Sequence, residues 1–237
     1  MAKPITVYWM CNETESIRAD APEKASKRFS SYDVKSDNSR SHIAVNYCPA
    51  VNKALKNLYA VKSLYDYSFT VDKDQCKSTM YDQAFFDKHV IVRSLEKRVF
   101  SFKNAYVFFT DEKSLEMTAY EHPIFEKNEV ARRCIPIMGK YDIGKWFRPL
   151  EFPFILRDEF DTFTVKEQDV LYYLRFHTDR PIVFKQVMMT DVLRTMLDQS
   201  TTATHYKKRT FKTLENFYSV FRGKNYVLKE IQDNLMQ

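Results

Sequence analysis

The chain has 237 residues, with 37 Lys and Arg against 31 Asp and Glu, a net charge of +6 and 44% apolar residues. It holds 19 Phe and 15 Tyr but only 3 Gly, and it lacks the glycine motifs of dinucleotide-binding folds, P-loop enzymes and α/β-hydrolases. These classes are therefore disfavoured, and the length predicts one domain, with or without an appended element.

The sequence predicts a protein of the reducing cytoplasm. Nothing in it approaches the roughly 18 consecutive apolar residues of a membrane-spanning helix. Residues 1–10 lack a small-residue cleavage site and are expected to form a first strand instead of a signal peptide. The cysteines at 11, 48, 76 and 134 are far apart, without a C-x-x-C pair or zinc-finger spacing, which predicts free thiols, some of them buried.

Residues 12–42 are polar and are expected to be largely loop, with a short helix over 22–29. One helical turn is expected within 49–58. Short β-branched and aromatic runs then recur, with turn signals every 8–12 residues: 42–47, 59–61, 65–71, 89–92, 98–102, 104–110, 115–120, 134–139 and 152–156. This spacing predicts a β-sandwich or jelly-roll-like body. The prolines of the last two runs are expected at sheet edges or strand starts.

The most explicit strand pair comes next. Residues 170–176 and 181–185 are two apolar runs separated by the turn His177-Thr178-Asp179-Arg180. This arrangement predicts a β-hairpin.

The periodicity becomes helical from residue 190 onward. Thr190 is expected to cap a helix over 191–199, and residues 200–203 are expected to be a linker. A longer helix is predicted over 204–222, stopped by Gly223 in the left-handed conformation.

A last helix is expected within 227–236. The predicted fold class is mainly β (α+β), with a β-rich body over 1–189 and a helical C-terminal segment over 190–237.

One motif is typical of a metal site. His177-Thr178-Asp179 at a strand end, with His205 as a third ligand, would suit Fe(II) in a jelly-roll oxygenase that uses 2-oxoglutarate. His205 follows His177 by 28 positions, which is short for that family, and it begins a predicted helix. The favoured interpretation is a polar turn and a protein without a cofactor.

The net charge is concentrated near the C-terminus. Residues 204–229 hold seven cations and one acid, a balance of 7 − 1 = +6, so the rest of the chain sums to zero. Lys207, Lys208, Arg209 and Lys212 are interleaved with aromatic residues and are candidates for contacts with nucleic acid or another acidic partner. The alternatives are a helix packed on the body with a solvated basic face, or a helix docked on a protein partner or a second copy.

A third candidate is the cluster Trp146-Phe147-Arg148-Pro149 after Gly144. It is typical of a strand-entry corner that anchors the body. The alternative is that Trp146 and Arg148 form the rim of a small-molecule pocket inside the β body.

Three segments together resemble a protein family of large tailed, myovirus-type phages, especially those of marine cyanobacteria. They are Cys48-Pro49-Ala50 with residues 55–57 and 59–63, the run from Gly144 to Pro149, and residues 171–176 with Thr178-Asp179. The resemblance covers about residues 45–190 of the 237. It implies a phage source and a place in the infected cell's cytoplasm or in the virion, and it implies no particular reaction.

The leading hypothesis is therefore a non-enzymatic binding or structural phage protein with a basic C-terminal helix for an acidic partner. Self-association or a protein partner is expected, and no membrane contact. The Fe(II)/2-oxoglutarate oxygenase and the small-molecule-binding β-sandwich remain the alternatives.

Overall fold

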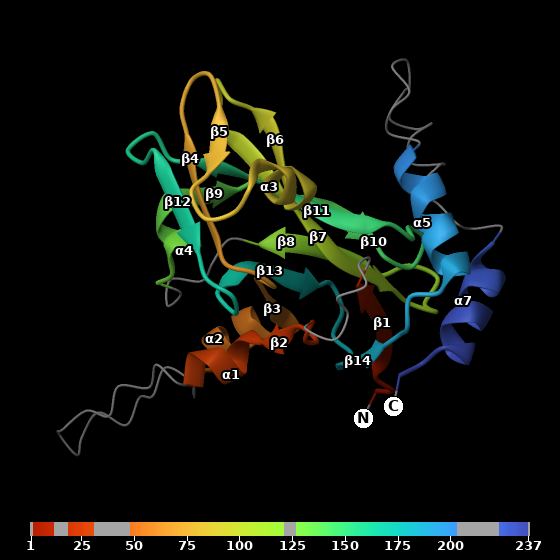
Figure 1. The fold of residues 1–237 in the computed structure, drawn as a ribbon. Coiled ribbons are helices and arrows are strands. Elements are labelled where there is room, and N and C mark those ends of the chain that lie inside the picture. Colours follow the sequence, from red (N-terminus) through yellow and green to blue (C-terminus); the bar gives the residue numbers. More distant parts are fainter. Residues whose placement is uncertain (1, 12–18, 31–47, 121–126, 203–222, 237) are drawn as a thin grey trace.

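The structure is a computed structural model that describes residues 2–11, 19–30, 48–120, 127–202 and 223–236. The strands form three mostly antiparallel sheets, and the helices lie on their outer faces and at their ends (Figure 1). The mainly β, α+β class with a sandwich-like body is confirmed. In the described ranges, no helix is long and apolar enough to span a bilayer.

A six-stranded sheet forms one side of the sandwich. Its order is β14-β1-β7-β11-β9, and β6 also pairs with β7. The bounds are β1 Ile5–Cys11, β6 Val90–Ser94, β7 Val99–Phe109, β9 Cys134–Pro136, β11 Pro149–Leu156 and β14 Ile182–Gln186. β1 runs parallel to β14 and antiparallel to β7. The first strand thus lies between strands from the end and the middle of the chain.

Two further sheets complete the body. A five-stranded sheet has the order β10-β8-β13-β3-β2, and a three-stranded sheet has the order β12-β4-β5. The bounds are β2 Glu23–Lys24, β3 Leu58–Lys62, β4 Tyr67–Val71, β5 Cys76–Ser78, β8 Glu116–Tyr120, β10 Lys140–Asp142, β12 Thr162–Val165 and β13 Val170–Phe176. The three-stranded sheet lies at the end of the molecule opposite α5 and α7 (Figure 1).

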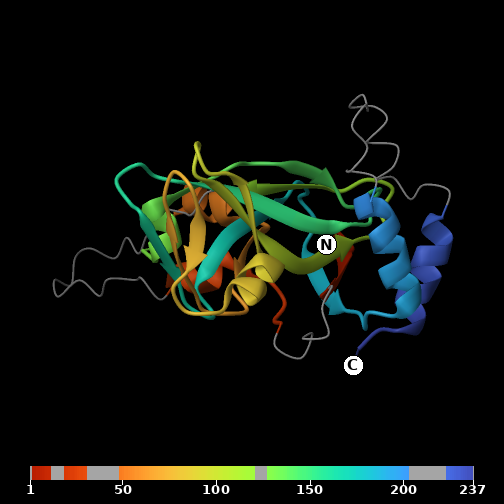
Figure 2. The same cartoon turned by 45° about the horizontal axis from the view of Figure 1, so that its top comes forward.

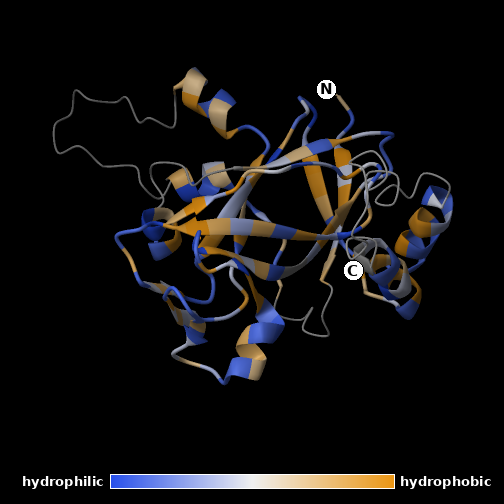
Figure 3. Ribbon diagram, turned by 90° about the horizontal axis from the view of Figure 1, so that it is seen from above, coloured by the Kyte–Doolittle hydropathy of each residue, from blue (hydrophilic) through white to orange (hydrophobic). Residues whose placement is uncertain are grey.

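The core lies between the sheets because the strands alternate buried and accessible residues. Every second residue of β4, β11 and β12 is buried, as the two-residue period of a strand requires. Phe69, Phe100 and Phe163 come from three strands, and their ring centroids lie 5.0–5.3 Å apart. Figure 3 shows the resulting hydrophobic strands around the centre of the molecule. Many of the Phe and Tyr residues therefore fill this core.

Two short helices cover the outer face of the five-stranded sheet. They are α1 (Ala25–Ser30) and α2 (Pro49–Leu55), which bear out the helices expected near 22–29 and 49–58. The residues buried beneath them are Ala25, Leu58, Ala60, Val170 and Tyr173, packed against Phe29 and Leu55. This face is therefore apolar at the end near α1 and α2.

Helices α5 (Asp191–Thr202) and α7 (Lys224–Asp233) lie side by side on the outer face of the six-stranded sheet (Figures 1 and 2). Their apolar stripes share one buried cluster with β1 and β7: Tyr8, Met10, Val107, Phe109, Phe147, Val187, Leu193, Leu197, Val227 and Ile231. Beyond α7, Met188 N–H donates to Asn234 O and Met236 N–H to Gln186 O, which adds a short bridge beside β14. The described ends of the helical segment are thus packed on the body.

Helices α3 (Gln83–His89) and α4 (Glu129–Arg133) were not expected from the sequence. Each begins at a capping side chain: Asp82 accepts from Phe85 N–H at 2.7 Å, and Asn128 accepts from Ala131 N–H at 2.9 Å. These caps are the signal that could have identified the two helices.

The predicted hairpin of residues 170–185 is wrong. β13 pairs with β3 and β8 in the five-stranded sheet, whereas β14 joins β1 in the six-stranded sheet. The turn at 177–180 therefore crosses from one sheet to the other. The side chain of Asn57 holds it by donating to Thr178 O at 2.7 Å and to Arg180 O at 3.0 Å.

Three smaller expectations also differ from the structure. Gly223 has φ −102°, which is not the expected left-handed conformation, and it is the N-cap of α7. α5 continues to Thr202 through the expected linker. Pro136 ends the edge strand β9 as expected, but Pro153 lies inside β11, where its carbonyl accepts from Ile137 N–H beyond the end of β9.

All four cysteines are free, as predicted, and those at 11, 76 and 134 are buried. The strand expected over 42–47 and the helix expected over 204–222 lie outside the described residues.

Candidate functional site

The turn that follows β7 and the turn that follows β10 meet beside α7. Asp142 joins them: its carboxylate accepts from Ser114 Oγ at 2.7 Å and from the N–H groups of Leu115 and Gly144 at 3.1 Å. Lys145 adds an ion pair at 2.7 Å. Burial raises the pKa of Asp142, but these donors outweigh burial, so the pKa lies below its ordinary value.

Gly144 allows the two turns to approach closely. A Cβ at this position would lie 2.7 Å from Glu112 O and 2.8 Å from the Cα of Ser114. Both neighbours are backbone atoms, so neither can move aside as a flexible side chain would. The glycine in the Gly144–Pro149 motif is therefore required by space.

Lys224, the first residue of α7, is held by this junction. Its ammonium donates to Glu112 O at 2.5 Å and to Gly144 O at 2.6 Å, and it lies 5.4 Å from the centre of the Phe109 ring. Burial lowers the pKa of Lys224 below its ordinary value, although nearby Asp111 opposes that shift. The start of α7 is thus tied to the body by a half-buried cation.

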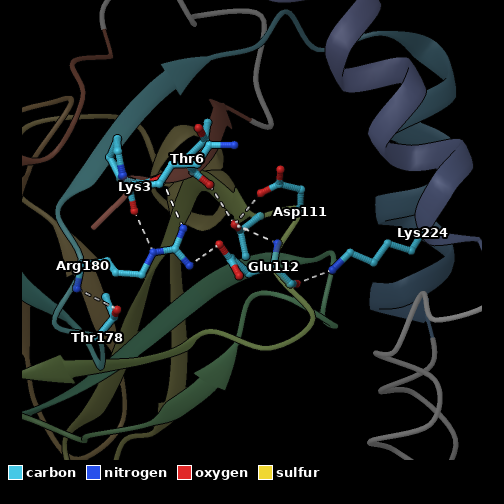
Figure 4. Close-up of polar contacts among 9 residues, drawn as sticks. Lys3, Thr6, Asp111, Glu112, Thr178, Arg180 and Lys224 are labelled. Atoms are coloured by element: carbon cyan, nitrogen blue, oxygen red, sulfur yellow. Dashed lines mark hydrogen bonds and ion pairs between the residues drawn. The ribbon is translucent and has the colours of Figure 1, made fainter. Parts of the chain in front are cut away.

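Arg180 extends the same polar network to the N-terminal strand (Figure 4). Its guanidinium donates to Lys3 O at 2.8 Å and to Pro4 O at 3.4 Å, and it pairs with Glu112 at 2.7 Å. Its N–H donates to Thr178 Oγ1 at 3.1 Å. Glu112 thus contacts Arg180 with its side chain and Lys224 with its carbonyl.

Trp146 and Arg148, the expected pocket rim, both lie near Tyr141. The rings of Trp146 and Tyr141 meet edge to face, with centroids 6.2 Å apart. Burial raises the pKa of Tyr141, although the charge of Arg148 opposes the shift. Between them, Phe147 is buried against Phe109 at 5.4 Å. The motif thus anchors a corner of the body, and its role as a pocket rim stays a prediction.

His177 and Asp179, the expected metal ligands, have separate partners. His177 Nε2 lies 2.7 Å from Thr118 Oγ1, and Asp179 pairs with Lys56 at 2.9 Å. Within the ranges that the structure describes, no three His, Cys, Asp or Glu side chains are grouped to hold a metal ion. The third expected ligand, His205, lies outside those ranges, so the Fe(II) site stays a prediction.

Lys207, Lys208, Arg209 and Lys212 also lie outside the described residues. The structure instead describes the two helices between which they occur. Thr190 Oγ1 caps α5 by accepting from Leu193 N–H at 3.2 Å, and it donates to Glu230 of α7 at 2.7 Å. The basic segment is therefore joined at each end to a helix packed on the body.

Sequence reasoning missed the role of Lys224, which it counted with the other cations of residues 204–229. One signal was present. A cation in the first turn of a helix opposes the helix dipole, so it calls for a specific partner.

No family model matches the chain, and no curated protein and no solved structure matches it either.

Proposed function

We propose that this chain is a binding or structural protein that contacts an acidic partner through the cations of residues 204–229. It acts without catalysing a reaction. The observation that carries the proposal is the charge of +6 in that one segment of an otherwise neutral chain. Clustered Lys and Arg residues neutralise phosphates or carboxylates and release counterions, which gives salt-dependent binding.

The anchoring of α5 and α7 supports this proposal. Leu193, Leu197, Val227 and Ile231 are fully buried against the β body. A charged segment between two such helices is presented from a fixed place on the molecule. Fixed attachment reduces the entropy that binding would otherwise lose.

Lys224 contacts the body, so the proposal concerns the other cations of residues 204–229. Its ammonium already donates to two carbonyls. Lys207, Lys208, Arg209 and Lys212 are therefore the residues to which we assign the partner.

The proposal includes the phage source that residues 45–190 suggest by resemblance. It places the protein in the infected cell, either free or as part of the particle. Peptides of this chain in the mass spectrum of purified particles would establish the second location.

Fluorescence anisotropy with random-sequence DNA and RNA across a salt series tests the acidic partner. We expect binding that weakens with salt. Changing Lys207, Lys208, Arg209 and Lys212 together to Gln should make the negative slope of log K against log salt less steep. For duplex DNA, its magnitude should decrease by about 0.9 for each phosphate that the variant no longer neutralises.

A matched control changes four exposed lysines elsewhere, Lys53, Lys73, Lys88 and Lys97, to Gln. It alters the net charge equally and should leave the slope within error. An identical decrease in both variants would contradict a specific role for the segment, and absence of binding at about 50 mM salt would remove nucleic acid as the partner.

A further inference from the structure

Strand β14 lies at the edge of the six-stranded sheet and pairs with β1 on one side. Alternate residues of a strand direct their N–H and C=O groups to opposite sides. Pro181 O accepts from Ile5 N–H at 2.8 Å. Val187 N–H donates to Trp9 O at 2.9 Å. The odd-numbered residues of this stretch therefore face β1, and the peptide groups of the even-numbered residues point to the outer side of β14.

One end of this outer side is occupied by the chain itself. Residues 234–236 run antiparallel beside it, and Met236 N–H donates to Gln186 O at 3.0 Å. The edge of β14 thus accepts an antiparallel strand. Among the residues that the structure describes, no strand pairs with the remainder of this edge. The outward peptide groups of Ile182 and Phe184 therefore lie on an open strand edge.

The open stretch is complementary to a copy of itself. With a two-fold axis at Val183, Ile182 lies opposite Phe184 of the second copy, and the same pair recurs on the other side of the axis. Both residues direct their peptide groups outward, and each such antiparallel pair exchanges two N–H···O bonds. Val183 meets its own counterpart in a pair without hydrogen bonds, with Cα atoms about 4.5 Å apart. This self-complementarity is what a two-fold interface requires.

The side chains along this edge favour the same contact. Val183, Met188 and Met236 are 43%, 56% and 41% exposed, and each lies on β14 or next to its outer edge. Lys185 is the charged residue of β14. In this register it lies opposite Pro181 of the second copy, so the two lysines do not face each other. Apolar contact thus accompanies the strand pairing, and repulsion between like charges does not oppose it.

The fold limits the pairing to residues 181–185. Before Pro181, the turn at 177–180 crosses to the five-stranded sheet and leaves the edge. After Lys185, the carbonyl of Gln186 is bonded to Met236. Two strands of five residues bury less surface than the roughly 1,600 Å² of a standard stable complex, so the association is expected to be transient.

We propose that two copies of this chain associate through β14, with residues 181–185 paired antiparallel about a two-fold axis at Val183. The two six-stranded sheets then form one continuous sheet. Pairing covers the open edge in both copies at once, which removes a template for uncontrolled strand addition. The interface uses none of residues 204–229, so it stands or falls apart from the acidic partner proposed there.

Sedimentation velocity of the full chain without nucleic acid tests the association. We expect the weight-average sedimentation coefficient to rise with protein concentration. Val183→Lys places two ammonium groups on either side of the axis and should weaken association by about tenfold. Val92→Lys is the matched control, since Val92 is 37% exposed on β6 of the same sheet. Equal weakening in both variants, or an unchanged chain that stays monomeric at every concentration, would overturn the proposal.

Cross-linking tests the register and does not depend on weakening the interface. Val183→Cys should form a disulfide-linked dimer on mild oxidation, because a Cα separation of about 4.5 Å lies within the disulfide range. Lys185→Cys should not, because it lies opposite Pro181 of the second copy. The unchanged chain gives the background from Cys48, which is partly exposed. Equal cross-linking of the two variants, or none by Val183→Cys, would contradict the register.

Hydrogen exchange followed by NMR identifies the peptide groups that pair. Raising the protein concentration should slow exchange of the amides of Ile182 and Phe184. The amides of Val183 and Lys185 already face β1, so their exchange should stay unchanged. This alternation separates strand pairing from a contact made by side chains alone. Association without added protection at residues 182 and 184 would show that another surface is the interface.

Discussion

At the scale of single residues, the junction of the two turns beside α7 depends on the absence of a Cβ at Gly144 and on the charge of Lys224. Gly144 lacks the Cβ that would collide with Glu112 O and Ser114. Because the turns can close, the carbonyls of Glu112 and Gly144 both point at the ammonium of Lys224. A half-buried cation at a helix start is unfavourable by itself, and these two acceptors make it tolerable.

Gly144→Ala should therefore destabilise the protein by about 1–3 kcal/mol, the usual range for overpacking. Gly139→Ala is the matched control, because its Cβ would meet a side chain instead of backbone: the Tyr141 hydroxyl at 2.6 Å and two ring carbons at 2.9 and 3.0 Å. Urea unfolding measures both. An equal destabilisation of the two variants would show that contact with fixed backbone is not the cause.

At the scale of elements, α5 and α7 behave as a pair joined at Thr190. This residue caps α5 and also donates to Glu230 of α7. The cap was predictable from the sequence, since Thr followed by Asp191 is a common helix start. The contact with Glu230 was not, because it joins residues 40 positions apart.

Thr190→Ala should cost about 1–2 kcal/mol, because it removes an N-cap together with a tie between two helices. Thr195→Ala in the same helix removes only a bond to Asp191 O and should stay within about 0.5 kcal/mol. Thermal unfolding gives the stabilities, and amide exchange of residues 224–233 shows whether α7 loosens. Unchanged protection of the α7 amides from exchange in Thr190→Ala would contradict a stabilising role for the Thr190–Glu230 hydrogen bond.

The elements also show what local patterns could and could not predict. Most strands and the helices near 22–29, 49–58 and 190–199 were predictable, because burial with a period of two or 3.6 residues is written in the local sequence. Strand partners were not. The turn at 177–180 looks like a hairpin, yet Ile182 on β14 pairs with Ile5 on β1. Of the candidate site, Trp146, Arg148 and His177 were singled out, whereas the contact of Thr118 with His177 was not, because it depends on sheet register.

At the scale of the whole molecule, the aromatic core sets how the protein responds to alkali. Burial raises the pKa of the Cys76 thiol from 9.0 to about 12 and also raises that of Cys134. In the unfolded chain these thiols ionise near their ordinary value. The stabilising contribution is therefore complete below pH 9 and is lost as the pH rises from 9 towards 12.

Stability should accordingly fall as the pH rises above 9. Cys76→Ala should make that fall shallower between pH 9 and 10, by up to one proton released on unfolding. Comparing slopes in this window removes the effect of the cavity itself, and the buried tyrosines such as Tyr59, whose pKa burial raises to about 12, contribute equally to both chains. Identical slopes for the variant and the unchanged chain would refute this account.

The position of β1 between β7 and β14 has a consequence for synthesis. Ile5 cannot meet its partner Ile182 until 177 further residues have been added, since 182 − 5 = 177. At about 5–20 residues per second, this edge of β1 stays open for roughly 9–35 seconds on the ribosome. An exposed strand edge invites pairing with other nascent chains. Expression at lower temperature or with a holding chaperone should therefore raise the recovered yield more than it does for proteins whose first strand pairs early.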